Sequence, residues 1–185
     1  KNIRIPFVGP DNRKGAKLAG DYLARSLSKG DPVAILEGVP SAFNAIQRKA
    51  GFEDSAQEAG WNVVSSQSAL WETEKANQVM AGIITEYPDL KAVLCANDSM
   101  AIGAVAALKG AGKLDQVKVV GYDNISAIQQ LIREGRVLCT IDQHADQLAV
   151  FGIEYALEML REKIQPEDRE TQVDLITLDT LQSRE

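Results

Sequence analysis

The hydrophobic pattern of the chain is an alternation of short apolar runs with longer amphipathic segments. The apolar runs are rich in β-branched side chains, and the longer segments repeat their apolar positions at helical spacing. This order predicts an α/β fold, in which strands alternate with helices to build a parallel, doubly wound sheet. Most of the strand segments are apolar throughout, as expected when helices cover both faces of the sheet.

The pattern predicts strands at residues 5–8, 32–38, 62–67, 92–96, 117–122, 137–141 and 172–178. It predicts helices at about 13–27, 41–59, 73–87, 98–110, 126–133 and 146–161. Asp11 is placed to cap the first helix and Gly60 to end the second. Ligands bind beyond the carboxyl ends of the strands in sheets of this kind, so the residues that follow each strand are the candidates for function.

The composition indicates a globular chain with an ordinary core, since 45% of the 185 residues are hydrophobic and 25% are charged. The formal net charge is −6 and the basic residues are scattered, which argues against nucleic acid as a partner. No apolar run approaches the roughly 20 residues that span a bilayer. No signal-peptide core follows the first residues, so we expect any export signal to have been removed or never present.

The sequence carries no pattern for a metal or a cofactor, and we expect neither. Cys95 and Cys139 form no CxxC or Cys/His cluster. They lie on strands that the 117–122 strand should separate, so both are expected to be buried and unpaired, beyond disulfide reach. The glycine–lysine element at 110–113 follows a helix and precedes a strand, the reverse of a P-loop. His144 is the single histidine, and no nucleophile is evident near it, so we expect a capping or surface side chain. We therefore predict that the protein is not an enzyme.

Polar and aromatic side chains gather at the predicted strand ends. Sugar hydroxyls both donate and accept hydrogen bonds, so a sugar site needs carboxylate, amide and guanidinium groups together. An aromatic face covers the apolar C–H face of a sugar ring. The side chains at the strand ends favour such a polyhydroxylated ligand; these positions are Gly38 with the helix that follows it, 68–71, 97–98, 122–124 and 142–144.

Three blocks at these strand ends resemble the signatures of type I periplasmic sugar-binding proteins of the ribose-binding kind. They are residues 96–104 (ANDSMAIGA), 119–124 (VVGYDN) and 140–143 (TIDQ). Residues 15–22 (GAKLAGDY) and 48–52 (RKAGF) are similar to the corresponding helices of that family. The order and spacing of the blocks fit ribose-binding relatives without a gap from Asp11 to Gln143.

The resemblance implies a Rossmann-like lobe of a two-lobed, periplasmic protein that closes on a monosaccharide and delivers it to the permease of an ABC importer. It also implies roles for five residues. Arg48 matches an arginine that holds the ring oxygen and hydroxyls, and Trp71 matches an aromatic that stacks on the sugar. Asn97, Asp123 and Gln143 match polar residues that take up hydroxyls, and Asp123 is expected to contribute most because a carboxylate forms charge-assisted bonds.

Each of these residues also has a purely structural interpretation. Arg48, beside Gln47 and Lys49, could be a solvated surface residue, and Trp71 could be a core or edge aromatic. The pair Asn97–Asp98 is typical of a helix cap, and we expect Asp98 to cap while Asn97 faces the sugar.

The resemblance covers nearly the whole chain but only part of the family's length. Residues 1–143 match the sugar-binding lobe, and residues 144–185 match a crossing helix followed by a returning strand. The family's first lobe is expected to precede Lys1, and the helix at 146–161 is expected to belong to it. A first-lobe fragment, or a second copy joined through that helix, is therefore an expected partner.

Two other functional classes compete with transport or chemotaxis reception of a ribose-like pentose. The effector core of a LacI-type transcription regulator shares the fold, but its DNA-binding segment has no room before Asp11. A small α/β enzyme would need a Gly-x-Ser-x-Gly elbow or an acidic cluster after the first strand, and neither is present.

Overall fold

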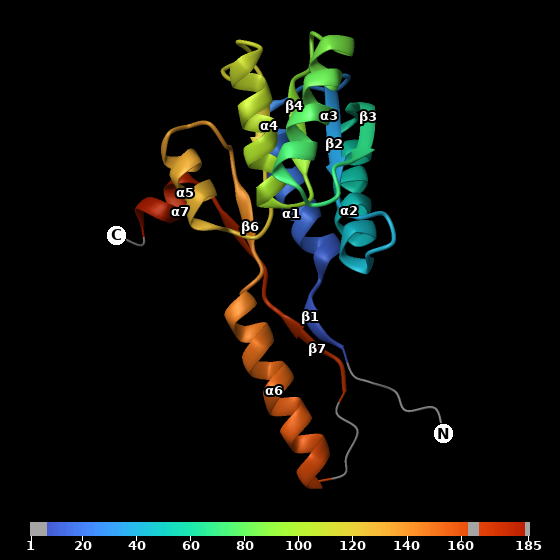
Figure 1. Ribbon diagram of the computed structural model, residues 1–185, viewed down its shortest axis with the longest axis vertical. Helices are drawn as coiled ribbons and strands as arrows, with labels where there is room; N and C mark the ends of the chain where they lie inside the picture. The colour runs from blue at the N-terminus through green and yellow to red at the C-terminus, as the bar shows by residue number, and fades with distance from the viewer. Residues whose placement is uncertain (1–6, 163–166, 184–185) are drawn as a thin grey trace.

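The centre of the molecule is a four-stranded parallel sheet with the order β3-β2-β4-β5 (Figure 1). The computed structural model describes residues 7–162 and 167–183. Beyond β5 a single parallel bridge joins Val120 to Cys139, and β6 (Thr140–Asp142) pairs antiparallel with β8 (Asp174–Ile176). The bounds of the sheet strands are β2 Pro32–Glu37, β3 Asn62–Ser68, β4 Ala92–Cys95 and β5 Lys118–Val120.

Helices cover both faces of this sheet, which accounts for the apolar strands. All four residues of β4 are buried, as are residues 33–36 of β2. Helices α1 (Asn12–Leu23) and α2 (Phe43–Ala59) pack against each other, as do α3 (Thr73–Glu86) and α4 (Asp98–Gly110). Right-handed crossovers place α2 and α3 on opposite faces, because the chain moves in opposite directions from β2 to β3 and from β3 to β4. The predicted doubly wound α/β class is confirmed.

The direction of travel along the sheet reverses between β2 and β4, so a crevice opens at the carboxyl ends of these two strands. Gly38 follows β2 and Ala96 follows β4 at this point. The site residues predicted from the strand ends are therefore drawn to one edge.

The helix ends follow the sequence signals with three exceptions, the first being that α2 begins at Phe43 and not at residue 41. Asp11 accepts a hydrogen bond from the Lys14 amide and caps α1, and Gly60 ends α2 in the left-handed region at φ 71°. The first helix stops at Leu23 and continues as a 3-10 turn to Ser26. Asn97, rather than Asp98 as predicted, caps α4.

The C-terminal segment differs from the single strand predicted at 172–178. It forms two three-residue strands, β7 (Arg169–Thr171) and β8, and then a short helix α7 (Leu178–Gln182) that packs against α5 (Ser126–Arg133). Strand β7 pairs in parallel with β1 (Val8–Pro10). The predicted first strand began at residue 5, and residues 5–6 lie outside the described part of the chain.

Helix α6 (Ala145–Glu162) and the β1–β7 pair extend away from the sheet as an arm (Figure 1). Arg169 of β7 lies 3.4 Å over the ring of Phe151 and also contacts Tyr155, so this side of α6 is partly covered. The opposite side is apolar and exposed, and its residues are Val150, Ile153, Leu157 and Leu160. The helical spacing in the sequence predicts a different unpartnered face, formed by Leu148, Gly152, Tyr155 and Met159 with Phe151 and Ile153 beside it; of its large apolar side chains only Ile153 lies on the exposed side.

Both cysteines are free and fully buried, as predicted. Cys95 lies on β4 and Cys139 lies beside β5, so a strand separates them. Burial raises the pKa of both thiols, which makes the reactive thiolate rare in the folded protein.

We expect Gly51→Ala to lower the free energy of unfolding by about 1–3 kcal/mol, because overpacking of a close helix contact costs this much. A Cβ atom at Gly51 would lie 2.2 Å from the Arg13 carbonyl oxygen on α1. Gly82→Ala on α3 is the control, since a Cβ there meets nothing within 4 Å and should stabilise the helix by up to about 1 kcal/mol. Urea unfolding that gave both variants the same sign would contradict this account of the α1–α2 contact.

Candidate functional site

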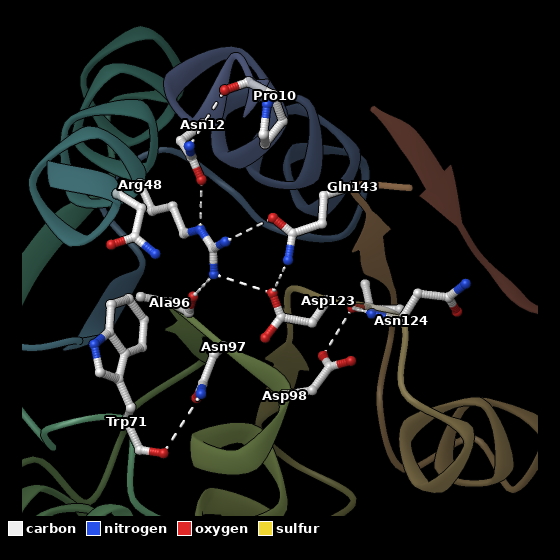
Figure 2. A network of polar contacts seen from close by, with 12 residues as sticks. Pro10, Asn12, Arg48, Trp71, Ala96, Asn97, Asp98, Asp123, Asn124 and Gln143 are labelled. Atoms are coloured by element: carbon white, nitrogen blue, oxygen red, sulfur yellow. Dashed lines mark hydrogen bonds and ion pairs between the residues drawn. The ribbon is translucent and has the colours of Figure 1, made fainter. Parts of the chain in front are cut away.

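Arg48 lies at the centre of a polar network at the carboxyl edge of the sheet (Figure 2). It projects from the second turn of α2, and only 3% of the residue is exposed. A guanidinium buried to this extent must be hydrogen-bonded and paired, because an isolated buried charge is very costly. The interpretation of Arg48 as a solvated surface residue is therefore wrong.

The guanidinium of Arg48 donates four hydrogen bonds to groups from four parts of the chain. Nε donates to Oδ1 of Asn12 at 2.8 Å, and Nη1 donates to the Ala96 carbonyl at 2.8 Å. Nη1 also donates to Oδ1 of Asp123 at 3.2 Å, and Nη2 donates to Oε1 of Gln143 at 3.1 Å. Gln143 closes the network, because its Nε2 donates to the same Asp123 oxygen at 2.8 Å.

Two aromatic rings hold the plane of the same guanidinium. The Arg48 carbon Cζ lies 3.7 Å from the ring centre of Tyr122 and 5.6 Å from that of Trp71. The indole of Trp71 passes over Gly38, where a Cβ atom would lie 2.1 Å from the ring. A glycine at the end of β2 is thus what lets the indole approach the site. Trp71 follows β3 in the loop before α3, where it is half-buried and also packs against the hydrophobic core, so the core interpretation holds in part.

Asp123 reaches Arg48 from a loop with unusual backbone angles. Asp123 and Asn124 have φ values of 117° and 60°, a region that L side chains rarely adopt. Burial raises the pKa of Asp123 above its usual range, although Arg48 acts in the opposite direction. One carboxylate oxygen accepts from both Arg48 and Gln143, and the side chain remains 27% exposed.

Asp98 supports this loop from below. Its Oδ2 accepts a hydrogen bond from the Ile125 amide at 2.9 Å, and its Oδ1 accepts one from the Thr140 hydroxyl at 2.8 Å. The Thr140 oxygen also accepts from the Asn124 amide at 3.3 Å. Asp98 is fully buried, and desolvation raises its pKa to about 7 against the effect of these two donors.

Asn97 caps α4 and also bonds the loop that carries Trp71. Its Oδ1 accepts from the Met100 amide at 2.9 Å and caps α4, and its Nδ2 donates to the Trp71 carbonyl at 3.4 Å. The side chain is half-buried at the rim of the network, next to Trp71 (Figure 2). The predicted division of labour is corrected: Asn97 caps the helix, while Asp98 holds the 123–125 loop.

The structure brings together all five residues predicted for the site, Arg48, Trp71, Asn97, Asp123 and Gln143 (Figure 2). It also adds Asn12, which the sequence reasoning missed. Asn12 follows β1 as the others follow their strands, so the same strand-end rule could have found it. The ring of Tyr122 was noted at a strand end, but its stacking on Arg48 was not predicted.

His144 directly precedes α6 and its carbonyl accepts from the Gln147 and Leu148 amides, so it occupies the capping position that was one of its two predicted roles, while its side chain is half-buried. Its Nε2 lies 2.8 Å from Oδ2 of Asp174 on β8, and only 20% of its side chain is exposed. Its amide donates to Oδ1 of Asp142, and its own φ is 52°. The residue thus joins the end of β6 to the neighbouring strand just before α6 begins.

Within residues 7–162 and 167–183, no group of three or more His, Cys, Asp or Glu side chains is arranged to hold a metal ion. Among the helices of that same part of the chain, none has the length and apolar character needed to cross a membrane.

The sequence is similar to known periplasmic binding proteins. The family described as periplasmic binding protein domain matches residues 1–164. The D-ribose/D-allose-binding protein of Pseudomonas aeruginosa is 54% identical over 181 residues, which are 96% of this chain and 57% of that protein. The chain thus spans little more than half the length of this relative.

Two solved structures of similar proteins superpose closely. An ABC transporter solute-binding protein from Burkholderia multivorans gives a TM-score of 0.92 at 55% identity, covering 95% of this chain and 62% of that one. A periplasmic solute-binding protein from Actinobacillus succinogenes with bound D-allose gives 0.91 at 36% identity, covering 96% and 63%.

The raised pKa of Asp98 predicts a pH-dependent stability. The folded carboxyl keeps its proton up to about pH 7, whereas an unfolded aspartate loses it near pH 4. The contribution is therefore complete below about pH 4 and is lost as the pH rises through about 7. We expect the free energy of unfolding of the protein, relative to Asp98→Asn, to fall by at most about 1.4 kcal/mol per pH unit in this window.

Urea unfolding at a series of pH values measures this difference. Asp115→Asn is the control, because the Asp115 side chain is 89% exposed and should not reproduce the effect. A difference between the protein and Asp98→Asn that stays constant from pH 4 to 7 would contradict the assignment.

Proposed function

Because this chain belongs to the periplasmic binding protein domain family, we propose that it forms the sugar-facing part of a solute-binding protein. This protein holds a monosaccharide in the periplasm and presents it to the membrane permease of an ABC importer. The role needs binding and release but no chemical step, so the proposal assigns the protein no enzymatic activity. The relatives support this role because they are named as sugar-binding or ABC transporter solute-binding proteins.

The network around Arg48 is the observation that carries the proposal. A guanidinium has five N–H groups, and four hydrogen bonds to described residues leave one for a ligand. Oδ2 of Asp123 forms no hydrogen bond to another residue in the described part of the chain, and the side chain is partly exposed. A charged donor and a charged acceptor held this close suit neighbouring hydroxyls, each of which accepts one bond and donates another.

Trp71 and Asn97 lie beside Arg48 and Asp123 at the carboxyl edge of the sheet and extend the proposed sugar site. The indole is half-buried and stacks toward Arg48, so its free face can cover the C–H face of a sugar ring. The Asn97 amide lies beside it and supplies a further donor and acceptor. Gln143 then contacts both the ligand and the network from the end of β6.

D-Ribose and D-allose are the proposed ligands. The two sugars share the configuration of the hydroxyls at C2, C3 and C4, so one set of donors and acceptors can serve both. The name of the Pseudomonas aeruginosa relative gives these same two sugars.

The division of the chain follows from the same proposal. Residues 1–143 would form one lobe, except that β1 pairs with β7 in the arm, and residues 144–185 would supply α6 and β7 to the other lobe before β8 and α7 return. The exposed residues Val150, Ile153, Leu157 and Leu160 support this division, because an unpartnered apolar stripe on a helix implies a covering partner. A first lobe would cover it, and a second copy of the chain is the alternative occupant.

We expect Asp123→Ala in the full-length, two-lobed protein to weaken sugar binding by about 2–4 kcal/mol, because sugar hydroxyls and Arg48 both lose a charged acceptor. Trp71→Ala should cost less, about 1–2 kcal/mol, since it removes stacking but leaves no polar group unpaired. Titration calorimetry with D-ribose and D-allose measures both. Asp115→Ala is the matched control and should bind as the unaltered protein does. A larger loss for Trp71→Ala would overturn this ranking.

The isolated 1–185 chain should bind sugar poorly and associate through α6. One lobe leaves the ligand wet on one side and forfeits the enclosure that typical small-molecule sites provide. Light scattering and calorimetry on the chain, before and after addition of a first-lobe fragment, test this expectation. A strictly monomeric chain that binds a monosaccharide with micromolar affinity unaided would contradict the two-lobed proposal.

A further inference from the structure

We propose that Asn12 is a positioning residue for this site, which fixes the direction of the Arg48 fork and links it to strand β1. This inference rests on the function proposed above and deepens it, because Asn12 would act on the sugar only through Arg48. Figure 2 shows Asn12 on the side of the guanidinium remote from Asp123, with Pro10 behind it.

Asn12 is not needed to cap its own helix. Asp11 already caps α1 by accepting from the Lys14 amide at 2.9 Å. Asn12 lies one residue later, only 6% exposed, and its side chain reaches α2. A buried amide that serves no cap and bonds to a residue 36 positions away has a tertiary role.

The amide of Asn12 forms two bonds of opposite kind. Its Oδ1 accepts from Nε of Arg48 at 2.8 Å, and its Nδ2 donates to the Pro10 carbonyl at 3.3 Å. Nε is the one guanidinium nitrogen on the side-chain stem, so a bond there sets the rotation of the whole fork. An aspartate could accept the first bond but could not donate the second, and an alanine could do neither.

The two bonds of Asn12 complete a path between two strands that lead out of the lobe. The path runs from the Pro10 carbonyl of β1 through Asn12 and Arg48 to Gln143, which directly follows β6. Strand β1 is part of the arm formed by α6 and the β1–β7 pair, and β6 leads into α6 of the same arm (Figure 1). A ligand held by Arg48 and Gln143 would thus be linked to both β1 and β6 through the Arg48 guanidinium.

The test measures sugar affinity in the full-length, two-lobed protein by titration calorimetry with D-ribose and D-allose. We expect Asn12→Ala to bind about tenfold more weakly, because Arg48 loses the acceptor that orients it. Asn12→Asp keeps that acceptor and should recover most of the loss. Ser55→Ala is the matched control, since Ser55 is also buried and also joins α2 to α1. It should lower the urea midpoint, as Asn12→Ala does, but change affinity less than twofold.

A double-mutant cycle separates positioning from other causes. In an Arg48→Lys background the side chain has no Nε–H to orient, so Asn12→Ala should cost little more. Full affinity in Asn12→Ala overturns the proposal. So does a tenfold loss that persists with Arg48→Lys, or an equal loss in Ser55→Ala.

A measurement made without sugar tests the positioning role of Asn12 independently of the proposed sugar binding. The Arg48 Nε–H signal in a ¹H–¹⁵N spectrum, assigned by its absence in Arg48→Lys, should exchange slowly in the unaltered protein. It should exchange fast in Asn12→Ala and slowly again in Asn12→Asp and Ser55→Ala. If neither sugar binds but this pattern holds, the proposed ligand is wrong and the positioning role stands. An unchanged signal in Asn12→Ala overturns that role even if sugar binds.

Discussion

Burial of the Arg48 guanidinium is the constraint on which the rest of the site depends. Removing an ion from water costs several kcal/mol even after relaxation, so every group around Arg48 must lie where it can offset that cost. The partners come from the start of α1, the end of β4, the loop after β5 and the residue after β6. The fold must therefore align four segments that are remote in sequence before the arginine can be buried at all. A lobe that satisfies this condition has its polar groups arranged before any ligand arrives.

The loop at Asp123 adds a second cost at the same edge. Residues held at positive φ cost about 1–3 kcal/mol each, and they persist only where the surroundings hold them. Asp98, Thr140 and Asp142 provide that support by bonding the Ile125 amide, the Asn124 amide and the Asn124 side chain. The support is itself a buried carboxylate with a raised pKa. The site thus consists of two polar layers, in which the lower one stabilises the backbone that presents Asp123 to Arg48.

Much of this arrangement could be predicted from the sequence, because buried parallel strands and amphipathic helices leave different periods in the chain. The strand-end rule and the resemblance together identified Arg48, Asp123 and Gln143, which the structure places in contact. Their role toward sugar remains a prediction. The segment at 169–182 was mispredicted because its two strands have three residues each, too few to show a period. The choice between Asn97 and Asp98 as the cap depended on Thr140 and Ile125, which lie far along the chain. Asn12 was overlooked because its neighbour Asp11 already accounted for the helix start.

The position of the network also bears on how binding could be coupled to movement of the arm. Strands β1, β6 and β8 join the sheet-bearing part to α6 and β7 (Figure 1). The Arg48 network bonds the end of β1 through Asn12 and the residue after β6 through Gln143. His144 follows Gln143 and bonds Asp174 at the start of β8, which brings in the third strand. Rotation of the arm requires backbone changes in these strands or their ends, so it must strain bonds that begin at the site.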